Sequence, residues 1–259
     1  GTLLNRERKI TKYTQDVIKK AMAQGVYFVP ATGRAVNALP PELKEMEGIR
    51  YGIFSNGATI YDLKEEKVIY KNHFEMDRVL ELMDFLKQFD LMESISLNGQ
   101  SYANKKEMEN IDYYELDSNT KAIVQGSRVL VDDLEMFVKE QSTTVEKTTL
   151  LFKTMEERRR AADALSKIED IQFSSSLPKN LEISKKGCNK GDGLFHLAKI
   201  LNIQMSCGDA DNDRELLESA GLAVVMENGL DSMKAIADYI TVSNQENGVA
   251  KAMEKFVLR

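Results

Sequence analysis

Short apolar segments alternate with helix-like segments at both ends of the chain, and this alternation constrains the fold more than any other feature. Residues 14–23 carry apolar side chains at helical spacing, and Gly25 stands where such a helix would end. The strands that we predict in this first part are residues 26–29, 51–54, 59–61 and 68–70, the last two as a pair. Helices between short apolar strands are typical of a sheet that helices cover.

The same alternation returns at Lys190 and continues to the C-terminal end. We predict helices at 190–201, 214–219, 232–237 and 249–256, and strands at 204–207, 222–225 and 239–242. Because helices connect these strands, the strands are expected to run parallel with both faces covered. We therefore expect an α/β fold with a Rossmann-like parallel sheet core, and we expect both ends of the chain to build that one sheet.

The middle of the chain follows a different pattern and is predicted to be an inserted α+β domain. Its predicted helices lie at 77–89, 132–140 and 154–168, and its predicted strands lie at 95–97, 145–152 and 181–183. Thr154 and Glu157 have the spacing of a capping box at the start of the third helix. The expected division is 1–61 for the first part of the core, 62–181 for the inserted domain and 182–259 for the second part of the core.

Composition and charge exclude several classes of protein. The chain has 259 residues, 42% hydrophobic and 29% charged, which suits one or two domains with apolar cores. The net charge of −6 and the dispersed basic residues disfavour nucleic acid as a partner. No apolar run approaches the roughly 18 to 20 residues of a membrane helix, and residues 1–10 lack a signal-peptide pattern. Cys188 and Cys207 form no CxxC pair. We therefore expect a cytoplasmic protein. The expected oligomeric state is a monomer or a weak homodimer.

An acidic loop follows the predicted strand at 204–207. Residues 208–213 read Gly-Asp-Ala-Asp-Asn-Asp, and such clustered carboxylates repel one another unless a hard cation neutralises them. A calcium loop of the EF-hand type is incomplete, because the sixth position from Asp209 is Arg214 and the twelfth is Ala220. Magnesium fits better, since it needs few protein carboxylates. The alternative is an exposed acidic turn in which Asp213 caps the next helix.

Two further segments suit a phosphate group. Thr32, Gly33 and Arg34 follow the predicted strand at 26–29, and they offer a hydroxyl, backbone amides and a guanidinium at one sheet edge. The alternative is a turn with a capping threonine and a surface arginine. Lys190 opens a predicted helix, where its ammonium can offset the charge of a phosphoryl group and a carboxylate. The alternative there is an ordinary surface lysine.

In this order along the chain, the segments resemble the haloacid dehalogenase phosphatases. The signature of that family is an aspartate pair in DxDGT, a threonine or serine after the second strand, a lysine and an acidic GDxxND-like loop. The segments that match this signature are 1–4, 31–34, 189–191 and 208–213. Ser55-Asn56-Gly57-Ala58 and the tail at 243–250 resemble the Cof-type branch, which carries a large α/β cap that supplies contacts for substrate specificity.

The resemblance implies a role for each matched residue. Thr32 would hold the transferring phosphoryl group, Lys190 would balance charge, and Asp209 would bind Mg²⁺ directly. Asn212 and Asp213 would orient the phosphate, the metal waters or Lys190, and Asp213 is a second candidate ligand for the metal. The remaining candidates for the phosphate pocket are Gly33, Arg34, Asn56 and Asn244.

The resemblance also implies a mechanism. An aspartate would attack the phosphate to give an aspartyl-phosphate, and water would then cleave that intermediate. Gly1 aligns with the glycine of DxDGT, so both aspartates and their strand are expected upstream of it, in a segment on the order of ten residues long. Without them, the sequence that begins at Gly1 is expected to form no aspartyl-phosphate and to be inactive.

Other functions remain open from the sequence. The main alternative is a non-catalytic protein that binds phosphate or magnesium on the same fold, and a phosphomutase is a further possibility. Serine or cysteine hydrolase chemistry has little support, because His73 and His196 are the only histidines and neither stands in a triad motif. The expected substrate is a small phosphorylated metabolite. A sugar phosphate is expected first, and nucleotides or a phosphorylated cofactor are the alternatives.

Overall fold

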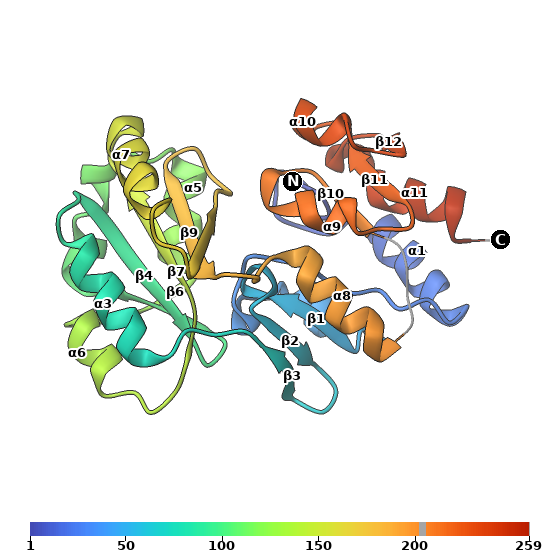
Figure 1. Ribbon diagram of the computed structural model, residues 1–259. Helices are drawn as coiled ribbons and strands as arrows, with labels where there is room; N and C mark the ends of the chain where they lie inside the picture. Colours follow the sequence, from blue (N-terminus) through green and yellow to red (C-terminus); the bar gives the residue numbers. More distant parts are fainter. Residues whose placement is uncertain (202–205, 259) are drawn as a thin grey trace. The chain divides into compact units, whose positions relative to one another are not determined.

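The computed structural model describes residues 1–201 and 206–258, and the chain forms two compact units (Figure 1). The first unit consists of Gly1–Thr32, Leu39–Tyr70 and Asn189–Arg259. The second unit consists of Gly33–Ala38 and Lys71–Cys188. The two ends of the chain therefore belong to one unit and the middle belongs to the other. The assignment of 1–61, 62–181 and 182–259 to a catalytic core and a cap stays a prediction.

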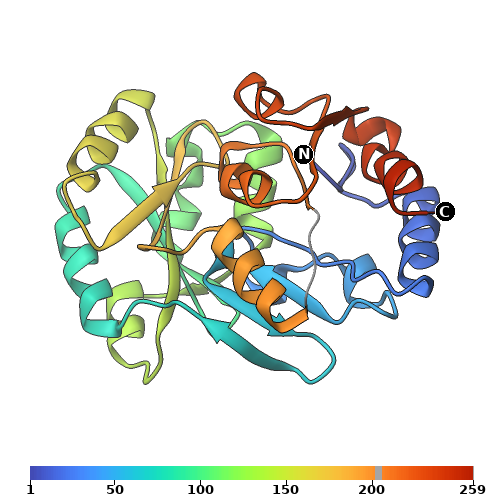
Figure 2. The same cartoon turned by 45° about the vertical axis from the view of Figure 1, so that its right-hand side comes forward.

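Two helices from opposite ends of the chain pack together in the first unit. Helix α1 (Lys12–Ala23) begins where the side chain of Thr11 accepts a hydrogen bond from the backbone N–H of Thr14. Helix α11 (Gly248–Phe256) lies beside α1 in both views (Figures 1 and 2), and the Tyr13 hydroxyl donates to Glu254 across the pair. Both helices were predicted from their apolar spacing, and both are confirmed.

The described strands of the first unit form two ladders of three strands. One is β1 (Tyr51–Phe54), β2 (Thr59–Asp62) and β3 (Lys67–Lys71), in which β1 and β2 are antiparallel. The other is β10 (Ser206–Gly208), β11 (Ala223–Met226) and β12 (Tyr239–Thr241), all parallel. The parallel α/β pattern is thus confirmed. The expectation of one continuous sheet is not, because the described strands of the two ends pair separately. Residues 204 and 205 of the predicted strand lie outside the described residues.

The predicted strand at 26–29 does not form. Instead, Ala31 makes a parallel bridge with Ile53: the Ile53 N–H donates to the Pro30 carbonyl at 2.8 Å, and the Thr32 N–H donates to the Ile53 carbonyl at 2.9 Å. The next bond of such a ladder would need an N–H on residue 30. Proline has none, so this bond of the ladder is lost, and no strand is found at 26–29.

Short helices complete the first unit. Helix α8 starts at Lys190. The side-chain oxygen of the preceding residue, Asn189, accepts from the N–H of Asp192 at 2.9 Å and so satisfies a donor of the first turn. The helices of this unit besides α1 and α11 are α2 (Pro41–Lys44), α8 (Lys190–Leu201), α9 (Arg214–Glu218), α10 (Asp231–Lys234) and the 3₁₀ turns η2 (Ser55–Gly57), η4 (Asp211–Asp213) and η5 (Asn244–Glu246). No helix in the described part of the chain is both long and apolar enough to span a membrane.

The second unit is built on one six-stranded sheet with the order β6-β5-β4-β7-β9-β8. The strands are β4 (Leu91–Leu97), β5 (Gln100–Asn104), β6 (Arg128–Val131), β7 (Val145–Phe152), β8 (Ile171–Ser174) and β9 (Asn180–Lys185). Neighbouring strands are antiparallel except β5 and β6, which are parallel. Strands β4, β7 and β9 contain the segments predicted from the sequence, whereas β5, β6 and β8 were not predicted.

Helices cover the sheet of the second unit. The helices α3 (Met76–Leu86), α6 (Leu134–Lys139) and α7 (Met155–Leu165) share an apolar cluster with β4, β7 and β9. The Thr154 hydroxyl caps α7 by accepting from the N–H of Glu157 at 3.1 Å, as the capping-box spacing predicts. The remaining helices of this unit are α4 (Lys105–Glu109), α5 (Ser118–Gly126), η1 (Val36–Ala38) and η3 (Ile111–Tyr114).

Candidate active site

The acidic loop after β10 is organised by Asp213. Its Oδ2 accepts from the backbone N–H of Asp209 at 3.0 Å and of Ala210 at 3.3 Å, and its Oδ1 accepts from Lys190 Nζ at 2.6 Å. Asp213 is 5% exposed and makes no side-chain cap bond to helix α9. The exposed, helix-capping role considered from the sequence is therefore wrong. The carboxylate instead fixes the backbone of the loop and pairs with the lysine.

Lys190 is buried rather than on the surface, with 7% of its side chain exposed. Helix α8 brings it to Asp213 because Gly191 lets α8 approach α9: a Cβ at position 191 would lie 2.5 Å from the backbone of Glu215. An ammonium has three N–H donors, and among the described residues Asp213 is its only side-chain partner. A buried lysine with donors to spare is a suitable group for binding an anion.

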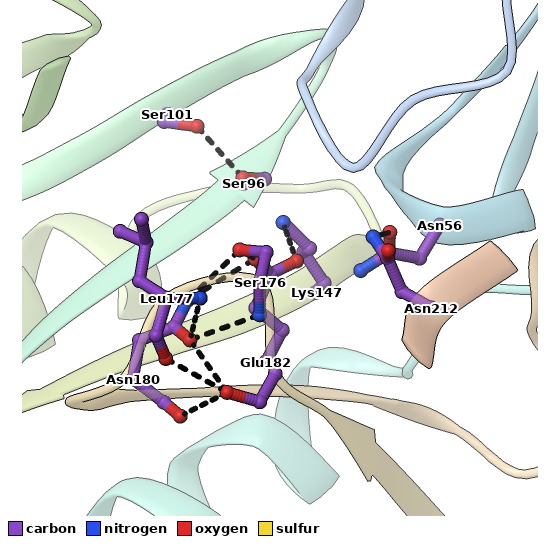
Figure 3. Close-up of polar contacts among 10 residues, drawn as sticks. Asn56, Ser96, Ser101, Lys147, Ser176, Leu177, Asn180, Glu182 and Asn212 are labelled. Carbon is purple, nitrogen blue, oxygen red and sulfur yellow. Dashed lines mark hydrogen bonds and ion pairs between the residues drawn. The ribbon is translucent and has the colours of Figure 1, made fainter. Parts of the chain in front are cut away.

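Turn η2 brings Asn56 between the threonine segment and the acidic loop. The Asn56 N–H donates to the Thr32 carbonyl at 3.1 Å, and the Asn56 side-chain oxygen accepts from Asn212 Nδ2 at 3.3 Å (Figure 3). Ser55 and Asn56 both have positive φ, 51° and 58°, a conformation that asparagine tolerates better than most residues. Asn56 is 4% exposed. Its strained backbone is thus held by bonds on both sides.

Gly57 explains how η2 reaches Lys190. Its φ is +98°, and a Cβ at this position would lie 2.0 Å from the Asn189 carbonyl oxygen. The backbone of η2 therefore packs directly on the residue that precedes α8. Through these contacts, six of the predicted site residues form one connected group within the first unit: Thr32, Asn56, Lys190, Asp209, Asn212 and Asp213.

Three predicted residues lie outside this connected group. Gly33 and Arg34 belong to the second unit, where Arg34 is exposed and its Nη1 donates to the Ala38 carbonyl at 3.3 Å. Asn244 lies in the first unit, where its Nδ2 donates to the Leu4 carbonyl at 2.7 Å. The roles of these three residues in phosphate binding stay predictions.

Asp209 faces the first residues of the chain. Its Oδ1 accepts from the Thr2 hydroxyl, and a Cβ at Gly1 would lie 1.8 Å from its Oδ2. Asn228 also reaches this segment, through a bond from its Nδ2 to the Gly1 carbonyl at 3.0 Å. Thr2 and Asn228 were not among the predicted site residues. Thr2 lies in segment 1–4, which matches the family signature, and Asn228 lies two residues after the end of the buried strand β11.

The carboxylates of the site differ in how well they suit Mg²⁺. In the described ranges no group of three or more His, Cys, Asp or Glu side chains is arranged to hold a metal ion. Magnesium keeps several waters and is often bound through one or two carboxylates, so Asp209 fits as a direct ligand. Asp213 fits less well, because both of its oxygens already accept hydrogen bonds. It suits the role of holding Lys190 and the loop.

The second unit contains a separate buried polar network on its sheet (Figure 3). Lys147 Nζ donates to Glu182 at 2.5 Å, and both side chains are at most 7% exposed. Glu182 also accepts from Ser176 and from Asn180 Nδ2, while Ser96 and Ser101 share a hydrogen bond of 2.8 Å. Each charge in this network is therefore paired within the unit itself, as buried ions require.

Comparison with known proteins places the chain in a family. A sequence model that describes haloacid dehalogenase-like hydrolases matches residues 1–253. The chain belongs to this family. A candidate phosphatase of Streptococcus pyogenes serotype M6 is 32% identical over 271 residues, which cover 100% of this chain and 96% of that protein. The 5-amino-6-(5-phospho-D-ribitylamino)uracil phosphatase YcsE of Bacillus subtilis is 27% identical, over 100% of this chain and 93% of its own length.

Solved structures agree with this membership. A haloacid dehalogenase-like hydrolase from B. subtilis matches with a TM-score of 0.86 and 25% identity, over 99% of this chain and 96% of that protein. The resemblance that the motifs indicated is thus confirmed, including the Cof-type branch. This haloacid dehalogenase-like hydrolase is accordingly a phosphoric monoester hydrolase.

Proposed function

We propose that the chain is a Mg²⁺-dependent phosphatase that hydrolyses small phosphorylated metabolites. The observation that carries the proposal is the buried Lys190–Asp213 pair, whose lysine retains donors for an anion beside the Asp209 loop. A buried cation that is fixed by a carboxylate on one side is suited to a phosphate on the other.

Each side chain of the site has its own proposed role in phosphate binding. Lys190 would offset the negative charge of the phosphoryl oxygens, and the Thr32 hydroxyl would donate to one of them. Asn56 and Asn212 would keep the threonine segment and the acidic loop in register through their mutual bond. Because these groups are already held by hydrogen bonds, little reorganisation is needed when the substrate binds.

Asp209 is the residue that we propose as the direct ligand of Mg²⁺. A magnesium ion held there would supply positive charge to the phosphate oxygens. The family resemblance implies that an aspartate accepts the phosphoryl group before water releases it. Thr32 and Lys190 would bind the phosphoryl oxygens in both steps.

The substrate is proposed from the relatives. YcsE acts, by its name, on a phosphorylated ribitylamino-uracil, which is a small metabolite with a polyol chain. We therefore propose phosphate esters of sugars and polyols as the first class of substrates. Nucleotides and phosphorylated cofactors are the alternatives.

A phosphate-release assay tests the proposal. The protein is incubated with a panel of sugar, polyol, nucleotide and cofactor phosphates, with Mg²⁺ or with EDTA. We expect release that is Mg²⁺-dependent and highest for sugar or polyol phosphates. No release from any ester would favour a non-catalytic binding protein. Transfer of phosphate to a second hydroxyl instead of water would indicate a phosphomutase.

A further inference from the structure

Two asparagines hold the first residues of the chain from two different loops. Asn228 follows β11, and Asn244 follows β12, so both lie where a parallel strand has ended. Asn228 Nδ2 donates to the Gly1 carbonyl at 3.0 Å, and Asn244 Nδ2 donates to the Leu4 carbonyl at 2.7 Å. The two bonds therefore hold the backbone before and after Thr2.

The two asparagines also hold each other. The Asn244 backbone N–H donates to Asn228 Oδ1 at 2.8 Å, so Asn228 uses its oxygen for one loop and its nitrogen for the N-terminal segment. Thr2 lies between Gly1 and Leu4, and its hydroxyl donates to Asp209 Oδ1. The loop of Asn228 reaches Asp209 directly as well, through the Leu230 N–H and the Asp209 carbonyl at 3.1 Å.

We infer that Asn228 and Asn244 are positioning residues that hold Thr2 against Asp209 and thereby preorganise the carboxylate for Mg²⁺. With Oδ1 fixed by Thr2, the carboxylate cannot rotate freely, and less ordering remains to be done when the cation binds. This inference rests on the proposed role of Asp209. It adds residues that neither the motifs nor the family signature single out for that role.

A purely structural clamp would behave differently. Asn228 is exposed, and loss of its bonds would then lower only the stability of a surface turn. Mg²⁺ affinity distinguishes the two roles: if the asparagines have only a structural role, replacing them leaves the Mg²⁺ affinity unchanged. The two roles also differ in how the effects of two substitutions combine. If Asn228 and Asn244 act through Thr2, replacing them has no further effect on Mg²⁺ affinity once the Thr2 hydroxyl is removed.

The experiment is a double-mutant cycle on the full-length protein, with Mg²⁺ binding measured by calorimetry. Asn228→Ala, Asn244→Ala and Thr2→Val are each expected to weaken Mg²⁺ binding by about three- to tenfold, which is the effect of one lost hydrogen bond. Asn228→Ala combined with Thr2→Val is expected to bind no more weakly than either single variant. Asn104→Ala serves as the control, because it removes the N-cap bond of α4 in the second unit. That control is expected to lower stability without changing Mg²⁺ affinity.

The outcomes separate the inference from the proposed function. Variants at Asn228 and Thr2 with additive effects, or with the Mg²⁺ affinity of the control, would overturn the positioning role even if the wild type is an active phosphatase. If the variants lose Mg²⁺ affinity in a coupled way but the wild type hydrolyses no ester, the positioning role is upheld and the phosphatase activity is rejected. A wild type that binds no Mg²⁺ would reject both.

Discussion

At the scale of single residues, burial decides which of the charged side chains are candidates for catalysis. The sequence allowed Lys190 and Asp213 to be ordinary surface groups, and only the structure shows them as a buried pair. The sequence did indicate the residue types, because a lysine at a helix start and clustered carboxylates after a strand match the order of the family signature. It could not indicate the Thr2–Asp209 bond, since that contact joins positions 207 residues apart.

Lys190 is predicted to be essential for phosphate release. Lys190→Met should lower kcat on any ester by a factor of about 10² to 10³, because a donor that stabilises transition-state charge is lost. Lys199→Met, an exposed lysine at the end of the same helix, is the matched control and should keep activity. Far-ultraviolet circular dichroism confirms folding of both. Equal activity of the two variants would show that Lys190 does not contact the phosphate.

The Lys147–Glu182 pair is predicted to be structurally sensitive. Lys147→Met should cost about 3–5 kcal/mol of unfolding free energy, because it leaves the Glu182 carboxylate buried without its cation. Lys147→Met combined with Glu182→Leu should cost less than the single change, since no buried charge remains. Urea denaturation measures both. A double variant that loses as much as the two single changes added together would show that the pair is not coupled.

Glu93 is predicted to make stability depend on pH. Burial raises the pKa of this carboxyl from 4.5 to about 8, and its Oε1 has no hydrogen-bond partner among the described residues. Between these values the folded state holds a proton that the unfolded state releases. The unfolding free energy should therefore fall as pH rises from 4.5 to 8, by up to about 1.4 kcal/mol per pH unit.

Glu93→Gln tests this dependence, because glutamine is neutral at every pH. The variant should lose the slope between pH 5 and 8 in denaturation experiments. Glu109→Gln, at an exposed position of α4, is the control and should keep it. If Glu93→Gln and the wild type show the same slope, the pH dependence comes from other groups.

At the scale of elements, the sequence predicted the strongly periodic helices and missed the short helices α2, α4 and α5 and the strands β5, β6 and β8. Helix spacing in α1, α7 and α11 is strong, and each is found where it was expected. Strand β5 (Gln100–Asn104) is polar, and β6 (Arg128–Val131) exposes Val129 and Leu130, so neither has the alternation of a half-buried strand. Strand β5 pairs with β4, and β6 pairs with β5, so both depend on partners that the local sequence does not indicate.

Turn η2 is predicted to matter both for the stability of the fold and for the geometry of the site. Both Gly57 and Gly25 have positive φ, but only at position 57 would an alanine Cβ meet backbone, 2.0 Å from the Asn189 carbonyl oxygen. Gly57→Ala should therefore lower stability by more than Gly25→Ala. It should also lower kcat, since Asn56 and Lys190 flank the contact. Thermal denaturation and phosphate release measure the two effects. Equal losses in both variants would show that backbone strain, and not the contact, matters at Gly57.

At the scale of the whole molecule, the family, the fold class and the pairing of 59–61 with 68–70 could be predicted from the sequence, while the separate pairing of the two ends of the chain could not. The motifs at 31–34, 189–191 and 208–213 carried the resemblance, and the family match over residues 1–253 agrees with it. A single sheet was expected because both ends alternate helix and strand. The described ends instead pair in two ladders, and Pro30 removes a donor that would have extended one of them.

The central claim is that Asp209, Lys190 and Thr32 surround one phosphate and its magnesium ion. A crystal structure of the full-length protein with Mg²⁺ and inorganic phosphate tests it most directly. The account predicts a magnesium ion about 2.1 Å from an Asp209 carboxylate oxygen, and phosphate oxygens within hydrogen-bond distance of Lys190 Nζ and the Thr32 hydroxyl. A metal bound away from Asp209, or a phosphate that contacts neither Lys190 nor Thr32, would contradict it.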